Sequence, residues 1–171
     1  MALIWPSAFG VEDSAAHAIS DRLDQLIGFR DQENLGLGYL TSTLRCYGYR
    51  VEVFDFQEDH TNILEAVRAL KPVLIGFSLI FQFYIDRFGA LIRYLRDRGV
   101  DCHYTMGGHF PSLSYQPTLE LIPELDSVVR FEGELTLLEL VDLLSTGQEW
   151  RNVRGIGRPR GGVQGLSPAF S

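Results

Sequence analysis

Small polar residues and glycines follow three of the apolar segments in this sequence, and together they could bind a small molecule. Ser78 and Leu79 end one apolar segment, Gly107-Gly108-His109 follow a second, and Glu132-Gly133 follow a third. Ser78 and His109 offer directional hydrogen bonds, while glycines let a ligand approach the backbone closely. The pattern predicts a binding site and identifies no catalytic or metal-ligating residue.

Aromatic side chains close to these groups would add apolar and stacking surface. They are Phe81, Phe110 and Phe131. Other interpretations stay open: Ser78 also suits the end of a buried strand, Gly107-Gly108 an ordinary turn, and the segment 81–84 a core or a partner surface. Glu132 and Glu134 could form a carboxylate pair, but we favour Glu134 as a stabilising charge in the first turn of a helix.

The elements that must position these residues follow from the apolar pattern. Five short segments rich in β-branched or aromatic residues read as strands, at 2–5, 51–56, 73–80, 101–106 and 127–131. Helical spacing of apolar residues predicts helices between and after them, around 37–47, 63–70, 88–95, 118–122 and 137–144. Strands alternating with helices predict an α/β fold: a doubly wound five-stranded parallel sheet in the flavodoxin-like (Rossmann-like) order 2-1-3-4-5.

In such a sheet, ligands bind beyond the carboxyl ends of the strands, near the point where strand order reverses. The candidate residues follow strands that would be neighbours, so they would line one edge. We expect one domain over residues 1–150, with a long loop at 10–34 that is either functional or disordered. Residues 151–171, rich in Gly, Arg and Pro, read as a linker or extended tail.

Composition excludes several classes of function. The net charge of −7 is a poor basis for binding nucleic acid, which depends on clustered positive charge. We see no membrane-spanning segment and no signal peptide, and the two cysteines, Cys46 and Cys102, form no C-x-x-C pair. We therefore expect a cytoplasmic protein with no membrane partner. Both cysteines are expected to be reduced and to pack in the core without a chemical role.

The order of these short motifs resembles the cobalamin (vitamin B12)-binding domain that precedes many radical S-adenosylmethionine (SAM) enzymes. The resemblance covers roughly residues 1–160, apart from the long loop. It is carried by Gly76-Phe77-Ser78-Leu79, Gly107-Gly108-His109-Phe110-Pro111, Phe131-Glu132-Gly133-Glu134 and the helix start Leu35-Gly36-Leu37-Gly38-Tyr39-Leu40, with smaller matches at Leu125-Asp126-Ser127-Val128-Val129 and Gly155-Ile156.

The resemblance implies cobalamin as the cofactor, with its nucleotide tail detached from cobalt and threaded along the strand ends. Ser78 would hydrogen-bond the tail, Gly107 and Gly108 would leave room for it, and Glu132 and Gly133 would close the far side. The corrin ring would lie near Pro6, Leu79 and Phe81. His109, Phe110 and Phe131 complete the expected cofactor-binding set.

Two motifs of related proteins are absent. The D-x-H-x-x-G sequence, whose histidine binds cobalt from below in domains of the methionine synthase type, does not occur, so no residue is expected to bind the metal. The C-x-x-x-C-x-x-C motif of radical SAM enzymes is also missing, so we expect no iron–sulfur cluster in this chain. Radical chemistry would then need a radical SAM domain or protein, in cis or in trans.

Three hypotheses about function follow. The first is a cobalamin-binding module that supports methyl transfer or related radical chemistry carried out by another domain or chain. The second is a flavodoxin-like sensor or flavin domain, but no acidic residues or glycine-rich turn directly follow the first strand. The third is a degenerate cobalamin-type domain that acts as a protein-interaction or substrate-recognition scaffold; the long loop at 10–34 is the feature that favours it.

Overall fold

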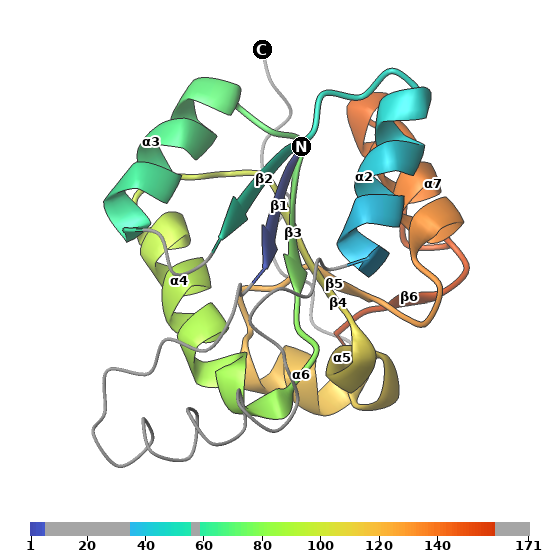
Figure 1. Ribbon diagram of the computed structural model, residues 1–171. Coiled ribbons are helices and arrows are strands. Elements are labelled where there is room, and N and C mark those ends of the chain that lie inside the picture. Colours follow the sequence, from blue (N-terminus) through green and yellow to red (C-terminus); the bar gives the residue numbers. More distant parts are fainter. Residues whose placement is uncertain (6–34, 56–58, 160–171) are drawn as a thin grey trace.

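A sheet of six strands with helices on both faces forms the chain over residues 1–5, 35–55 and 59–159, which are the residues that this computed structural model describes (Figure 1). The strand order is β2-β1-β3-β4-β5-β6. The first five strands are parallel to one another, and β6 is antiparallel to β5. The strands are β1 (Ala2–Trp5), β2 (Glu52–Asp55), β3 (Leu74–Ser78), β4 (His103–Gly107), β5 (Ser127–Val129) and β6 (Ile156–Gly157).

The helices form two covering layers and a cap. Helices α2 and α7 cover one face of the sheet, α3 and α4 cover the other, and α5 and α6 lie at the carboxyl ends of the strands (Figure 1). A 3-10 turn, η2 (Gln82–Tyr84), leads into α4. The helices are α2 (Leu35–Cys46), α3 (His60–Leu70), α4 (Ile85–Asp97), α5 (His109–Leu113), α6 (Tyr115–Leu121) and α7 (Glu134–Ser145).

The α/β fold predicted from the sequence is confirmed, and so is the order 2-1-3-4-5 of its five parallel strands. The sheet has one strand more than expected, because β6 adds an antiparallel edge within the segment that we expected to be a linker or tail. The short helix expected at 118–122 begins earlier, as α6, and a further helix, α5, starts directly after Gly108.

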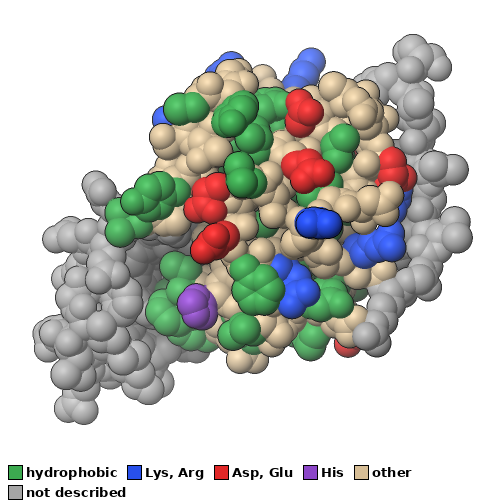
Figure 2. Space-filling view, turned by 90° about the vertical axis from the view of Figure 1, so that its right-hand side faces the viewer, with side chains coloured by type: hydrophobic (Ala, Val, Ile, Leu, Met, Phe, Trp, Pro, Cys, Tyr) green, Lys and Arg blue, Asp and Glu red, His purple; other side chains and the backbone are tan. Residues whose placement is uncertain are grey.

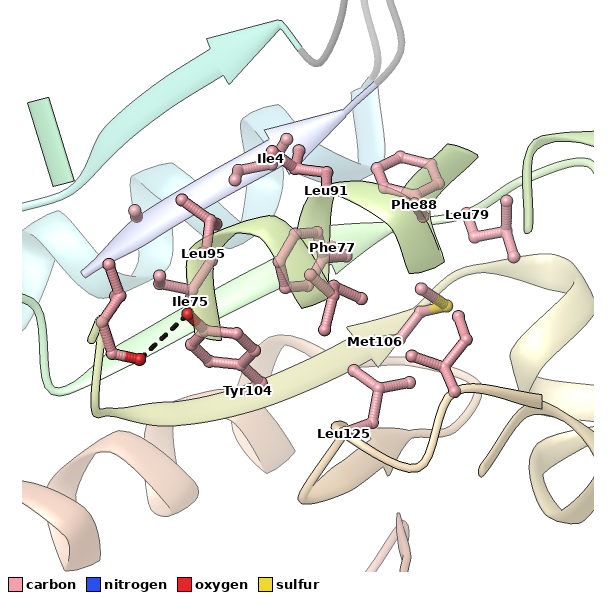
Figure 3. Packing of buried hydrophobic residues seen from close by; sticks show 14 of the residues in the cluster. Ile4, Ile75, Phe77, Leu79, Phe88, Leu91, Leu95, Tyr104, Met106 and Leu125 are labelled. Carbon is pink, nitrogen blue, oxygen red and sulfur yellow. Dashed lines mark hydrogen bonds between the residues drawn. The ribbon is translucent and has the colours of Figure 1, made fainter. Parts of the chain in front are cut away.

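The alternation of side chains along the strands divides the core into two clusters. Ile75, Phe77, Tyr104 and Met106 point toward α3 and α4, where they pack with Leu91 and its neighbours (Figure 3). Leu74 and Leu3 point to the opposite face, where they pack with residues of α2 and α7. Both faces are therefore buried, as expected for a parallel sheet between helical layers.

Arg96 ties together the amino ends of β4 and β5. Its guanidinium donates hydrogen bonds to the Asp126 carboxylate (2.7 Å) and to the carbonyl oxygens of Cys102 and Glu124 (3.1 Å each), and it stacks 3.8 Å from the centroid of the Tyr104 ring. Asp126 also accepts the backbone N–H of Tyr104 at 2.7 Å. This network stabilises the amino ends of β4 and β5, at the opposite end of the sheet from the carboxyl ends of the strands.

The two cysteines differ from the expectation that both are buried. Cys46 ends α2 and is exposed, whereas Cys102 is half-buried before β4, and burial raises the pKa of its thiol to about 12. Cys46 follows Leu44 on a helix whose buried stripe comprises Leu37, Thr41 and Leu44, so its side chain lies outside that stripe. The prediction of a buried Cys46 was wrong.

Candidate ligand-binding site

A cavity of about 390 Å³ opens at the carboxyl ends of the central strands, between α2 and α7. Seven residues of the predicted binding set line it: Ser78, Gly107, Gly108, His109, Phe131, Glu132 and Gly133. They come from the ends of β3 and β4 and from the loop that joins β5 to α7. The strand ends therefore bring together most of the residues that the sequence singled out.

The remaining members of the predicted set lie elsewhere. Leu79 is fully buried in the cluster beneath α4, close to Phe88 and Met106 (Figure 3), and Phe110 packs against the same cluster. Phe81 stacks on Phe83, with ring centroids 5.5 Å apart, and does not line the cavity. Pro6 lies outside the described residues, as does the loop at 10–34.

Several lining residues were not predicted, and they form the floor and walls of the cavity. The floor includes Leu3, Gly76 and Thr105, and the wall on the α2 side consists of Gly36, Leu37 and Leu40. The signal for the floor lies in the period-two alternation of strands, since residues 76 and 78 share a face, and so do 105 and 107. The α2 wall belongs to the helix start at residues 35–40, which the resemblance included without assigning it a contact with the ligand.

Gly107 and Gly108 are glycines for different reasons. Gly108 has φ 114° and ψ −174°, a region essentially restricted to glycine, and a Cβ there would overlap the Leu79 carbonyl oxygen. At Gly107 a Cβ would lie 3.4 Å from the Val129 carbonyl oxygen, an ordinary contact distance. The protein's own packing therefore requires glycine at position 108 but not at 107, where the missing side chain leaves room in the cavity.

The Ser112 hydroxyl connects the loops that follow β4 and β5. It donates a hydrogen bond to the Gly108 carbonyl (2.7 Å) and accepts one from the backbone N–H of Phe131 (2.8 Å). Arg130 Nε donates to the Ser112 carbonyl at 3.2 Å. Because Gly108 and Phe131 both line the cavity, this one buried hydroxyl fixes the distance between two parts of its rim.

Phe131 combines backbone strain with exposure. Its φ of 60° lies in the left-handed region, which is an outlier for a bulky residue, yet its side chain is 66% exposed. Further exposed apolar residues adjoin the lining residues in the chain: Leu35, Tyr39 and Leu135. On the side of α7, hydrophobic side chains gather beside a histidine at the lower end of the molecule (Figure 2). Of these exposed apolar residues, Phe131 is the one that lines the cavity, so its ring is available to a ligand there.

A buried polar chain lies beneath the floor. His103 Nε2 is 2.8 Å from Ser127 Oγ, and Ser127 Oγ donates to Thr105 Oγ1 at 2.8 Å. Burial lowers the pKa of His103 to about 4, so its ring is neutral near pH 7. The His103 and Trp150 rings pack edge to face, with centroids 4.5 Å apart.

The charges that line the cavity are negative. Glu132 and Glu134 stand at the start of α7, and no lysine or arginine is among the described lining residues. Glu134 occupies the first turn of α7, the stabilising role that we favoured for it. Among the described residues, no three His, Cys, Asp or Glu side chains gather in a way that could hold a metal ion, and no helix is long and apolar enough to cross a bilayer.

Comparisons with known proteins identify a family and several relatives. A family model described as "B12 binding domain" matches residues 30–141. The chain is 31% identical over 125 residues to an uncharacterized methyltransferase from Pyrococcus horikoshii, covering 71% of this chain and 27% of that protein. It is 28% identical over 141 residues to a hopanoid C-3 methylase from Methylococcus capsulatus, covering 81% and 27%. The chain thus spans about a quarter of the length of these relatives.

Two solved structures share the fold. The radical S-adenosylmethionine methyltransferase TsrM from Kitasatospora setae superposes with a TM-score of 0.69 at 21% identity, covering 92% of this chain and 28% of that one. The cobalamin-dependent radical enzyme OxsB, solved with aqua-cobalamin bound, gives a TM-score of 0.66 at 24% identity, covering 91% and 20%.

Proposed function

Because this chain belongs to the B12-binding domain family, we propose that it holds a cobalamin whose nucleotide tail, detached from cobalt, occupies the cavity at the strand ends. In this role the chain is a module that supports radical SAM methyl transfer, or related radical chemistry, carried out by another domain or chain. Two relatives, one named as a methyltransferase and one as a methylase, support this division of labour, because each is about four times as long as the segment that matches this chain.

The observation that carries the proposal is a cavity of the right size in the right place. Ligand pockets span roughly 300–1,000 Å³, so 390 Å³ suits the nucleotide part of cobalamin while the corrin ring stays outside. Gly107 supports the fit, because a side chain that the protein could accommodate there is missing from the wall of the cavity.

The residues of this chain would bind the tail in two ways. The Ser78 hydroxyl and the His109 ring would hydrogen-bond its polar groups, and Gly107 and Gly108 would let it approach the backbone. Phe131 and the neighbouring exposed apolar side chains would contact the part of the cofactor outside the cavity. The chemistry that cobalamin supplies when bound is transfer of a methyl group or an electron at cobalt.

The charge of the lining argues against a flavin or dinucleotide. Such cofactors carry phosphates that are held by helix N-termini and cationic side chains. Here Glu132 and Glu134 occupy the N-terminus of α7 that faces the cavity, with no lysine or arginine among the described lining residues to offset them. The cobalamin tail carries a single phosphodiester charge, so a ligand that places an apolar base on the floor and this one charge nearer the mouth is favoured over one that presents a pyrophosphate.

Titration with hydroxocobalamin, followed by visible absorption and calorimetry, tests the proposal. We expect binding with the spectrum of a tail-detached form, abolished by Ser78→Tyr, which would fill the cavity. Ser42→Tyr, at an exposed position of α2 outside the lining, is the matched control and keeps the binding. Absence of binding by the unchanged protein at high micromolar cobalamin would overturn the proposal and leave the degenerate scaffold as the function to pursue.

A further inference from the structure

The cavity floor is built from three side-chain positions that lie in one row across the sheet. Leu3 pairs with Gly76, and Gly76 pairs with Thr105, in the registers of β1 with β3 and β3 with β4. All three residues are buried. Gly76 and Thr105 lie two residues before Ser78 and Gly107, which end their strands, and Leu3 lies two residues before the end of β1. The row therefore forms the deep end of the cavity, behind the polar groups of its mouth.

The floor presents carbon atoms although one of its residues is a threonine. A Cβ built on Gly76 would lie 2.8 Å from Leu3 Cδ2 and 3.9 Å from the Thr105 methyl carbon, so both carbons adjoin the space left above the glycine. The backbone N–H and C=O groups of these strands are engaged in the sheet. A ligand that reaches the floor meets an apolar surface.

The Thr105 hydroxyl is directed away from the floor by the neighbouring strand. Its Oγ1 accepts the Ser127 hydroxyl proton (2.8 Å) and donates to the Ser127 carbonyl oxygen (3.3 Å). Since the Ser127 proton is committed to Thr105, the His103 ring donates its Nε2 proton to Ser127 Oγ (2.8 Å). Each hydroxyl proton of the chain His103–Ser127–Thr105 is thus used within the protein, and the threonine side chain is held in one rotamer.

A ligand group buried against this floor finds no hydrogen-bonding partner there. Each buried donor or acceptor left unpaired weakens affinity roughly tenfold to hundredfold. The outer edge of a benzimidazole ring carries only carbon, whereas the same edge of adenine carries a ring nitrogen and an amino group. The two bases are similar in size and shape, so the floor distinguishes them by polarity.

We propose that the chain His103–Ser127–Thr105 makes this cavity selective for cobamides with a benzimidazole base over cobamides with a purine base. The inference rests on the proposed function, because it requires the nucleotide tail to enter the cavity. Thr105 determines the selectivity directly, and Ser127 and His103 are positioning residues that act through it.

Three corrinoids test the inference on the full chain: cobalamin, the cobamide with adenine as its base, and cobinamide, which has no nucleotide tail. We expect cobalamin to bind at least tenfold more tightly than the adenine form, and cobinamide to bind most weakly. Equal affinity for cobalamin and the adenine form, both tighter than cobinamide, would overturn the selectivity and leave the proposed function standing. Equal affinity for cobalamin and cobinamide, or no binding of any of the three, would instead overturn the tail-binding function itself.

Two variants test whether Ser127 positions Thr105 for selectivity or only stabilises the fold. Ser127→Ala removes the hydroxyl that donates to Thr105 Oγ1 and leaves Thr105 only its longer bond to the carbonyl of residue 127 (3.3 Å). The freed lone pair of Thr105 Oγ1 can then accept a hydrogen bond from the ligand, so the ratio of adenine-form to cobalamin dissociation constants should fall at least threefold. Thr105→Val keeps the shape of the side chain without its hydroxyl and should keep the ratio high. A structural role alone would weaken binding of both cobamides equally and leave the ratio unchanged in Ser127→Ala. If that variant does not fold, the comparison in the unchanged protein still decides the selectivity.

Discussion

Ser112→Ala is the most direct test of how the rim of the cavity is held. The substitution removes the hydroxyl that donates to the Gly108 carbonyl at 2.7 Å and accepts the Phe131 N–H at 2.8 Å. Two hydrogen bonds contribute about 1–3 kcal/mol together. The Gly108 carbonyl keeps a second donor, the backbone N–H of residue 112 at 3.2 Å, so we expect the loss to be about 1–2 kcal/mol.

Urea unfolding followed by circular dichroism measures this loss as a lower midpoint at an unchanged slope. A thermal scan should show a decrease of about 2–4 °C for each kcal/mol lost, given a domain of this length. Ser114→Ala is the matched control, since Ser114 lies two residues away and makes no side-chain cap to α6. Cobalamin affinity should decrease in Ser112→Ala alone, because Phe131 is no longer held. Identical unfolding midpoints and affinities in the two variants would refute the idea that Ser112 fixes the rim.

Three further predictions concern strain, protonation and space. Phe131→Gly should leave the free energy of unfolding unchanged or raise it by about 1 kcal/mol, because the left-handed backbone costs a bulky residue roughly that much. The same substitution should weaken cobalamin binding. A clear loss of stability would show that the exposed ring is needed for folding. The pKa of His103 is lowered to about 4, so the native state binds fewer protons than the unfolded state between pH 4 and pH 6.5, and stability should decrease by roughly 3 kcal/mol as pH falls through that range. His103→Gln, which retains a neutral donor, should flatten this dependence in urea unfolding at stepped pH, and parallel curves would contradict the assignment. Gly107→Val should abolish cobalamin binding. Its unfolding midpoint should change less than that of Gly108→Ala, because a Cβ at position 108 would overlap the Leu79 carbonyl. Equal stability losses in the two variants would mean that both glycines serve packing alone.

Much of this architecture was predictable because parallel strands buried on both faces leave a strong sequence pattern. The segment 73–80 is apolar almost throughout, and its residues Leu74 to Phe77 are indeed all buried. Ser78 was correctly expected at the strand end, on the side that lines the cavity. Leu79 was placed beside it although neighbouring residues of an extended chain point to opposite faces, and that alternation puts Leu79 in the core.

Other features left weaker signals. β6 is only two residues long, so it has no apolar run that could reveal it in the sequence. One of its residues is Gly157, where a Cβ would overlap the Tyr115 ring. The floor residue Thr105 reads as an ordinary strand residue, and its connection to Ser127 and His103 depends on the register of β4 with β5. Such registers are set by the assembled sheet and cannot be deduced from either segment alone.

The network around Arg96 lies at the amino ends of the strands, whereas the cavity lies at their carboxyl ends. Interactions that hold the sheet together are thus spatially separated from the side chains that would meet a ligand. Rim positions that make no packing contact, unlike Gly108 and Ser112, can therefore vary without disturbing the network at the amino ends. One framework can in this way present different ligand-facing side chains while its sheet stays the same.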